Sequence, residues 1–294
     1  MSDWITIRND ALSAAINPLG AELSSIRDAA GRELMTDADP AFWSGRAPIL
    51  FPIVGEASGG VIRVDGRTYP IKRHGFARHM MFAVVDQRDA SVTLELLADE
   101  ATRAAYPFDF RLRLTFALDG ATLTTTAEIA NPDTARDLPA SIGFHPAFAW
   151  PLPYAAPRDA HRITFAADES EPLRALTDGG LIKSDPRPSP LVDGRTLALA
   201  DALFEADALI WDPVRSDSVS YGADSGQRLH VAFTDTPQLG VWTKPGAHFV
   251  CIEPWHGIAD PEGYAGEYRE KPGVFTIPPG GTKRVGWSVT LQGA

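Results

Sequence analysis

Three short segments of the chain carry side chains that could transfer protons. They are residues 72–78 (KRHGFAR) with His74, residues 143–148 (GFHPAF) with His145, and residues 251–257 (CIEPWHG) with Glu253. A histidine can donate a proton near neutral pH, and a carboxylate can accept one. Each segment contains glycine or proline, so we expect these side chains to lie outside helices. Together they predict acid–base chemistry on opposite sides of one small molecule.

The composition is that of an ordinary globular protein. The chain has 294 residues, of which 44% are hydrophobic and 22% charged, and this length is enough for a large core. No charge block, Ser-rich linker or fixed-period repeat marks a boundary. We therefore expect residues 1–294 to form a single domain, because all-β folds of this size exist as one unit.

The charge balance and the cysteine content exclude several classes of protein. The net charge is −11 and the pI is about 5.1, so the basic footprint of nucleic-acid or membrane-surface binding is missing. Cys251 is the single cysteine, so no internal disulfide is expected. No signal-peptide pattern and no apolar run near the ~20 residues of a membrane span is evident. These features predict a cytoplasmic protein with a small-molecule partner, and they leave a homodimer open.

Apolar and polar residues alternate with period two along much of the chain. Residues 110–116 place Phe and Leu on one face, and residues 122–129 read as their partner strand after Asp119-Gly120. Residues 92–97 and 229–233 are further predicted strands. Residues 61–71 read as a hairpin around Asp65-Gly66, and residues 274–291 as a second hairpin around a Pro-Pro-Gly-Gly turn.

Helical signals are few. Residues 98–106 predict a short helix that ends before Pro107, and residues 37–43 predict another helical turn. The chain contains 25 Gly and 24 Pro, which disfavours long helices. Many short strands with frequent turns predict an all-β sandwich or barrel with few short helices. Residues 151–201, rich in Pro and Asp, predict long connections over the sheet surface.

Six motifs in order resemble the aldose 1-epimerase (galactose mutarotase) superfamily, and the LacX-like branch in particular. They are residues 46–55 (RAPILFPIVG), 74–78 (HGFAR), 106–110 (YPFDF), 143–148 (GFHPAF), 207–210 (DALI) and 251–257 (CIEPWHG). The resemblance covers nearly the whole chain. It implies one large antiparallel β-sandwich of the galactose-mutarotase-like type (a supersandwich), with a sugar site in an open cleft on the concave sheet.

The resemblance also implies an activity, the interconversion of the α and β anomers of a free hexose. The sugar ring opens at C1–O5, C1–C2 rotates, and the ring closes on the other face. By resemblance, His145 is the general acid that protonates O5, and Glu253 is the general base at the O1 hydroxyl. No metal and no cofactor is required. We expect a bell-shaped pH profile with a base limb from Glu253 and an acid limb from His145.

The resemblance further implies a set of substrate-binding residues. His74 is similar to the family's second histidine, and Arg46 to its sugar-binding arginine, whose five donors suit vicinal hydroxyls. Asp207 and Trp255 are further candidates, as acceptor and as stacking platform. Trp242 is assigned to the core, and Arg78 and Asp260 to a structural pair or to loop anchors. Residues 142–144 differ from the Asn-rich segment of better-known galactose mutarotases, so galactose specificity is not implied.

Three other interpretations stay open from the sequence alone. A hexose-6-phosphate 1-epimerase would need basic residues at the cleft rim, for which Lys72, Arg73, Arg78 and Lys244 are candidates. A non-catalytic carbohydrate-binding or sensing protein could use the same fold. A metal site of two histidines and a glutamate lacks any supporting spacing such as His-Glu-x-x-His.

Overall fold

The largest sheet of this all-β protein is built from segments in which apolar and polar residues alternate. The computed structural model describes residues 4–293. Nine antiparallel strands run in the order β15 (Thr196–Ala198), β14 (Arg162–Phe165), β17 (Ser218–Gly222), β18 (Arg228–Thr234), β22 (Thr282–Gln292), β10 (Thr122–Ala130), β9 (Arg111–Asp119), β8 (Ser91–Leu97) and β7 (Ala83–Arg88). In β9 every second residue from Leu112 to Leu118 is buried, as the sequence predicted.

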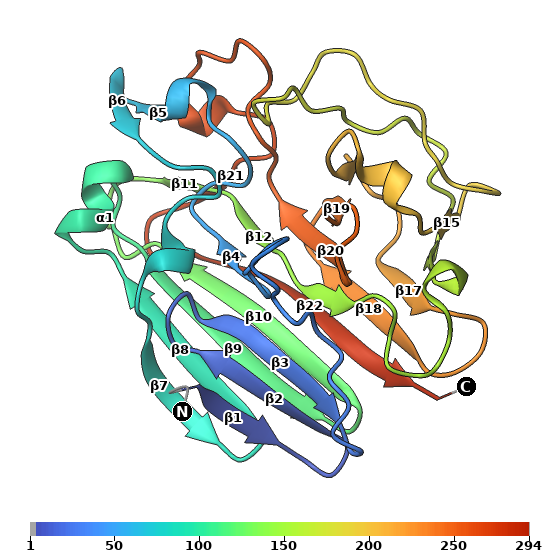
Figure 1. Cartoon of the computed structure of the whole chain (residues 1–294). Coiled ribbons are helices and arrows are strands. Elements are labelled where there is room, and N and C mark those ends of the chain that lie inside the picture. Colours follow the sequence, from blue (N-terminus) through green and yellow to red (C-terminus); the bar gives the residue numbers. More distant parts are fainter. Residues whose placement is uncertain (1–3, 294) are drawn as a thin grey trace.

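Smaller sheets lie against the nine-stranded sheet and complete a sandwich (Figure 1). The first contains β1 (Ile5–Arg8), β2 (Leu12–Asn17) and β3 (Glu22–Asp28), which lie across β8 to β10. The second has six strands: β16 (Leu209–Trp211), β19 (Gln238–Trp242), β20 (Phe249–His256), β12 (Ile142–Phe144), β4 (Ile49–Leu50) and β13 (Ala147–Ala149). Two-stranded pairs join β11 (Leu138–Ala140) to β21 (Phe275–Ile277) and β5 (Val61–Val64) to β6 (Arg67–Pro70). Buried side chains of both layers form the main core.

Helices are short in the part of the chain that the structure describes. The α-helix is α1 (Glu100–Ala105), and the 3₁₀ turns are η1 (Ser58–Gly60), η2 (Ala77–His79), η3 (Arg158–Ala160), η4 (Asp201–Phe204) and η5 (Tyr268–Glu270). Asp99 and Thr102 form a capping box at the start of α1, which ends before Pro107 as predicted. Residues 37–43 form only a turn, closed by the Trp43 N–H bond to the Asp39 carbonyl (2.9 Å). Within residues 4–293, every helix is too short to cross a membrane.

One predicted hairpin is confirmed and the other is wrong. In the β5–β6 hairpin, Asp65 and Gly66 both have positive φ (52° and 74°), as a tight two-residue turn requires. Residues 274–291 do not form a hairpin, because β21 pairs with β11 while β22 pairs with β10 and β18. Gly280 and Gly281 bond instead to the backbone of Asp133 and Asn131, so this turn moves the chain from one sheet to another.

Residues 151–201 are partly irregular, as expected. They contribute β14 and β15 to one edge of the nine-stranded sheet. Between Phe165 and Thr196 the chain forms turns and isolated bridges only. In Figure 1 this yellow-green stretch arches over the six-stranded sheet, and in this way it can form one wall of a cleft.

Candidate active site

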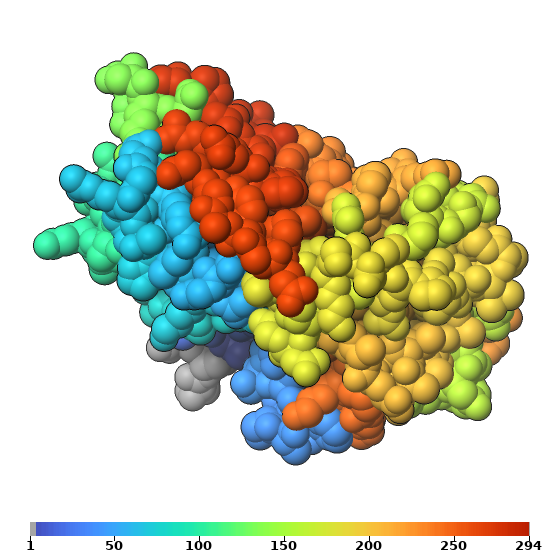
Figure 2. Space-filling view, turned by 90° about the horizontal axis from the view of Figure 1, so that it is seen from above, coloured from blue at the N-terminus to red at the C-terminus, as the bar shows by residue number. Residues whose placement is uncertain are grey.

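A cleft of about 600 Å³ lies over the six-stranded sheet. Its lining comes from segments far apart in the sequence, namely residues 43–78, 176–183, 204–210, 242–245 and 253–259, together with His145. Figure 2, seen from above, shows several of these segments meeting on one face, where the blue, yellow and red parts of the chain adjoin. The cleft therefore depends on tertiary packing and not on one continuous segment.

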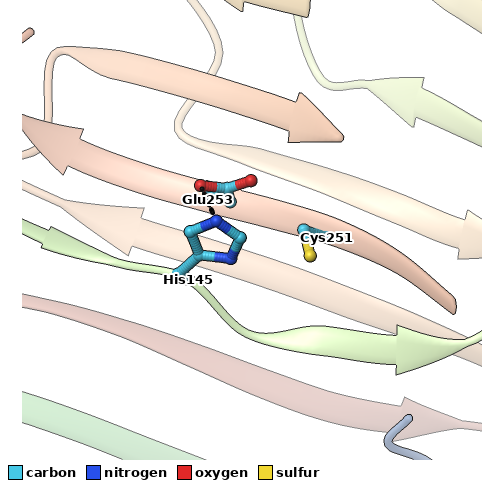
Figure 3. Close-up of side chains that lie close together, drawn as sticks. All are labelled: His145, Cys251 and Glu253. Carbon is cyan, nitrogen blue, oxygen red and sulfur yellow. Dashed lines mark ion pairs between the residues drawn. The ribbon is translucent and has the colours of Figure 1, made fainter. Parts of the chain in front are cut away.

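Strand pairing places His145 directly beside Glu253. β12 and β13 both pair with β20, and the register runs from Gly143 opposite Trp255 to Ala147 opposite Cys251. The same register sets His145 opposite Glu253. Pro146 has no N–H to donate to the strand ladder, and it lies where the chain is interrupted between β12 and β13. His145 Nε2 lies 3.1 Å from Glu253 Oε2, as Figure 3 shows.

Burial pushes both members of this pair toward their neutral forms. Glu253 is 1% exposed and His145 is 9% exposed. Desolvation, reinforced by the charge of Asp207, raises the pKa of Glu253 well above its ordinary value. Desolvation lowers the pKa of His145 to about 3, and Arg78 acts in the same direction. Over the intervening pH range the pair holds one proton, which either residue can carry.

His74 lies next to this pair with a defined tautomer. Its ring centroid is 6.1 Å from that of His145, and its Nδ1 accepts a hydrogen bond from the Gly55 N–H (3.0 Å). Burial, with the nearby charges of His145, Arg78 and Arg73, lowers the pKa of His74 well below its ordinary value. The neutral ring must then carry its proton on Nε2, which makes it a hydrogen-bond donor for a ligand.

Trp255 and Asp207 both line the cleft. Trp255 is two residues from Glu253 on β20, and thus on the same face of the strand. Its indole lies over Gly143 and Gly240, where a Cβ would be 2.5–2.6 Å from the ring. Glycines on both neighbouring strands therefore let the indole lie flat on the sheet. Asp207 has φ of +70° and is exposed, and its carboxylate accepts from the Ala208 N–H (2.7 Å).

Arg46, in contrast, does not line the cleft. Its guanidinium donates to the carbonyls of Ser24 (3.2 Å), Thr36 (2.7 Å) and Asp37 (3.2 Å). These contacts tie β3 to the loop that follows it, and they occupy donors that the sequence assigned to sugar hydroxyls. The geometry of this structure corrects that expectation and gives Arg46 a role in holding the loop.

Two tryptophan rings lie beside His145, and the sequence did not predict either of these contacts. The ring of Trp43 is 4.9 Å from that of His145, and the ring of Trp242 is 5.9 Å from it. The two indoles are nearly perpendicular to each other, at 88°. Trp242 is half-buried: it packs against two buried clusters, in agreement with its assignment to the core, and it also lines the cleft. Trp43 follows a turn without any motif, and no signal in the sequence marked it.

The expected Arg78–Asp260 pair is also absent from the described residues. Asp260 instead forms a buried ion pair with Lys271 (2.9 Å) and accepts from the Ser58 N–H (2.8 Å), so it does anchor a loop. Arg78 lines the cleft and donates to the Arg73 carbonyl (3.0 Å). It is therefore a further charged residue of the site.

Cys251 is the third ionisable group beside the pair. Ligand atoms of His145, Cys251 and Glu253 lie within 4.8 Å of one another (Figure 3). Burial raises the pKa of the Cys251 thiol well above its ordinary value, and the charge of Glu253 adds to this. A thiolate, the form that binds metals, is thus disfavoured here. The metal site considered from the sequence joined two histidines to Glu253, and this cluster has a thiol in place of His74.

Comparisons with known proteins point to one family. The aldose 1-epimerase family model matches residues 3–271. Over 295 aligned residues the chain is 31% identical to the chromosomal protein LacX of Lactococcus lactis subsp. lactis, covering 98% of this chain and 99% of LacX. A galactose mutarotase related enzyme from Lactobacillus acidophilus has a TM-score of 0.90 at 30% identity, over 98% of this chain and 97% of that one.

A second solved structure, a galactose mutarotase-like protein from Lactobacillus casei ATCC 334, also has a TM-score of 0.90. It is 29% identical over 98% of this chain and 100% of that one. The likeness in fold therefore extends over nearly the whole chain. Because the sequence match and the shared fold each span nearly the whole chain, we conclude that it belongs to the aldose 1-epimerase family.

Proposed function

We propose that this chain is a cofactor-independent aldose 1-epimerase, which interconverts the α and β anomers of a free hexose. The observation that carries the proposal is the 3.1 Å contact of His145 Nε2 with Glu253 Oε2 in the cleft. Ring opening needs a proton at O5 and the removal of a proton from the O1 hydroxyl. O5 and O1 are bonded to the same carbon, so an acid and a base in contact can reach both oxygens.

The proposed mechanism uses the single proton of the pair. That proton first moves from Glu253 to His145, which leaves a carboxylate beside an imidazolium. Glu253 then takes the O1 proton while His145 gives its Nε2 proton to O5, and the C1–O5 bond breaks to leave an open-chain aldehyde. After rotation about C1–C2, the two groups exchange roles and the ring closes. The Nε2–H of His74 is placed to donate to a ring or hydroxyl oxygen. The indole of Trp255 offers a flat apolar surface beneath the C–H face of the sugar.

The experiment that tests the proposal is anomer exchange, followed by polarimetry or NMR with a panel of free and 6-phosphorylated aldoses. Wild-type protein is compared with Glu253→Gln. Acceleration by wild type alone supports the epimerase. Sugar binding without acceleration would overturn it in favour of a carbohydrate-sensing protein.

A hexose-6-phosphate substrate is the second candidate, because four basic side chains line the cleft: Arg73, Arg78, Lys183 and Lys244. Three further carboxylates, those of Asp178, Glu205 and Asp207, line the same cleft. Arg73 is also paired with Glu56 (3.2 Å), and Lys244 donates to the Phe42 carbonyl (3.2 Å). This mixed charge gives a phosphate no uniformly basic subsite, so we favour the free sugar. A higher kcat/KM for the 6-phosphate in the panel would reverse the choice.

The pH dependence of kcat/KM is expected to be bell-shaped, with both limbs set by the proton that His145 and Glu253 share. The pKa of His145 is lowered to about 3, so the acidic limb, where the pair gains a second proton, should lie near pH 3. The pKa of Glu253 is raised, so the alkaline limb, where the pair loses its proton, should lie above the ordinary glutamate value. A rate that rises through pH 4–5 would instead show Glu253 titrating as an ordinary base.

Trp43 is expected to contribute to sugar binding more than to chemistry. Trp43→Ala should raise KM about fivefold with little change in kcat, because loss of an aromatic contact removes on the order of 1 kcal/mol of binding. Trp43→Phe keeps a flat apolar face and serves as the control. Saturation kinetics on the preferred sugar provide the measurement, and an unchanged KM in Trp43→Ala would place the sugar elsewhere.

A further inference from the structure

Three side chains with metal-binding atoms meet beside the cleft. One ring nitrogen of His145, the sulfur of Cys251 and a carboxylate oxygen of Glu253 all lie within 4.8 Å of one another. An ion placed centrally among three such atoms would be no more than about 2.8 Å (4.8 Å/√3) from any of them, whereas zinc bonds to N, O and S ligands are about 2.0–2.3 Å long. Side-chain shifts below about 1 Å would therefore complete a three-ligand site.

The pairing of the strands holds these three ligands together. Cys251 and Glu253 are two residues apart on β20, so their side chains leave the same face of the strand. The neighbouring edge of the sheet sets His145 opposite Glu253, with Nε2 at 3.1 Å from Oε2. Figure 3 shows the three side chains side by side. The ligands are thus carried by the sheet and its strand connection and not by a long loop, which favours a preorganised site.

The burial of this cluster is a second sign of a ligand. Cys251 is 0% exposed, Glu253 1% and His145 9%, and the rings of Trp43 and Trp242 pack against the buried cluster around Cys251. The Nδ1 atom of His145 is buried and has no hydrogen-bond partner within residues 4–293. In Figure 3 this nitrogen lies on the side of the ring toward Cys251. Buried polar atoms without partners are unfavourable, so this group of side chains calls for an explanation beyond packing.

We propose that this cluster is an inhibitory site for a thiophilic divalent cation such as Zn²⁺, with His145, Cys251 and Glu253 as its three protein ligands. Thiolate and imidazole ligands select zinc-like ions over Mg²⁺ and Ca²⁺. His145 and Glu253 line the cleft, so an ion can reach them from solvent, and the fourth position of a tetrahedral ion is left open to the cleft.

Binding exchanges two protons for the ion. Cys251 loses its thiol proton, and His145 and Glu253 lose the single proton that they share. The thiolate and the carboxylate then carry two negative charges, which the two positive charges of the ion neutralise, while the imidazole stays neutral. Burial disfavours a thiolate that stands alone, but it does not oppose a set of ligands whose charge the ion cancels.

The inhibitory part of this inference rests on the proposed epimerase function. Anomer exchange needs the proton that passes between His145 and Glu253, and an ion bound to both side chains takes the lone pairs that would receive it. Cys251 does not line the cleft and has no part in the proposed mechanism. The sulfur should therefore be required for inhibition and not for turnover.

The test uses the full-length protein after treatment with a chelator. Co²⁺ is the spectroscopic probe, because a thiolate bound to cobalt gives an intense charge-transfer band in the near ultraviolet. Cys251 is the single cysteine of the chain, so such a band reports on this site alone. Calorimetry measures the affinity for Zn²⁺, and anomer exchange is followed with and without Zn²⁺. Mg²⁺, which prefers oxygen ligands, is the control ion.

Cys251→Ser removes the thiolate at nearly constant size, and His248→Gln is the matched control. The His248 side chain is 70% exposed, and its Nδ1 lies 4.0 Å from Asp37 Oδ2. This surface pair offers Zn²⁺ a competing place that involves no sulfur. The two variants therefore separate the buried cluster from a histidine–carboxylate pair at the surface.

We expect one Zn²⁺ per chain, a cobalt–thiolate band, and anomer exchange that stops at one equivalent of Zn²⁺ and is restored by EDTA. Cys251→Ser should weaken Zn²⁺ binding at least ~10-fold, a loss found even for residues behind the metal ligands. The same variant should lack the band and keep metal-free exchange near the wild-type rate. His248→Gln should behave as wild type, and Mg²⁺ should not inhibit.

A wild-type protein without the cobalt–thiolate band would overturn the inference, and this readout needs no variant to fold. An affinity for Zn²⁺ that is unchanged in Cys251→Ser would overturn it too, as would inhibition that disappears in His248→Gln. Binding without inhibition of an active protein would overturn the inhibitory role. If no aldose is turned over, the proposed function fails, but the cobalt band and the calorimetry still decide whether the ion binds.

Discussion

Glu253→Gln and His145→Asn are each expected to slow anomer exchange at least ~100-fold, because positioned proton transfer contributes 10²–10⁴ to such rates. Glutamine keeps the shape of Glu253 but cannot accept the O1 proton. Asparagine can still occupy the place of His145 beside Glu253, but it cannot give a proton to O5. The measurement is the exchange rate under saturating sugar, followed by NMR. A loss below about threefold at either site would contradict the assigned role.

The stability of Glu253→Gln provides the control that its fold is intact. The folded-state pKa of Glu253 is raised above the unfolded value. Its contribution to stability is therefore fully present below the unfolded pKa, and it is lost as the pH rises through the folded pKa. Glutamine stays neutral, so the variant should melt at a higher temperature than wild type at alkaline pH. An inactive variant with raised stability would separate loss of chemistry from loss of structure.

Gly75→Ala is expected to destabilise the protein by more than about 3 kcal/mol, a size found when a backbone clash adds to strain. Gly75 has φ of +71°, and a Cβ there would lie 2.2 Å from the Phe51 carbonyl oxygen. That carbonyl accepts the N–H groups of Phe76 and Ala77. The substitution would therefore push the loop of His74 away from β4 and disturb the site as well as the fold. Denaturant unfolding and the exchange rate measure the two effects.

Gly31→Ala is the matched control for Gly75. Gly31 has a similar φ of +80°, but a Cβ there meets nothing within 4 Å. It should cost only about 1 kcal/mol, the strain of a left-handed conformation without a clash. If the two variants lost the same stability, the close contact with Phe51 would not be the cause. The absence of a side chain at Gly75 thus allows the backbone of Phe51 to approach closely.

The local sequence determined much of the fold. The alternation in residues 110–129 predicted β9 and β10, because the pleat alone sends successive side chains to opposite faces. Asp65-Gly66 predicted a hairpin, because the turn needs only two adjacent residues that tolerate positive φ. The hairpin predicted around residues 278–281 was wrong, because turn residues indicate that the chain changes direction but not which strand the following segment pairs with.

The motifs also predicted the acid and the base of the proposed site, and they resembled the family to which the chain belongs. Only the tertiary structure decided their arrangement. His145 meets Glu253 because β12, β13 and β20 share one register. Arg46 turns to loop carbonyls, while Trp43, Trp242 and Arg78 enter the cleft. The physical reason is that burial and neighbouring groups fix both the direction in which a side chain points and its pKa. Those neighbouring groups come from segments distant in the sequence, which no local pattern encodes.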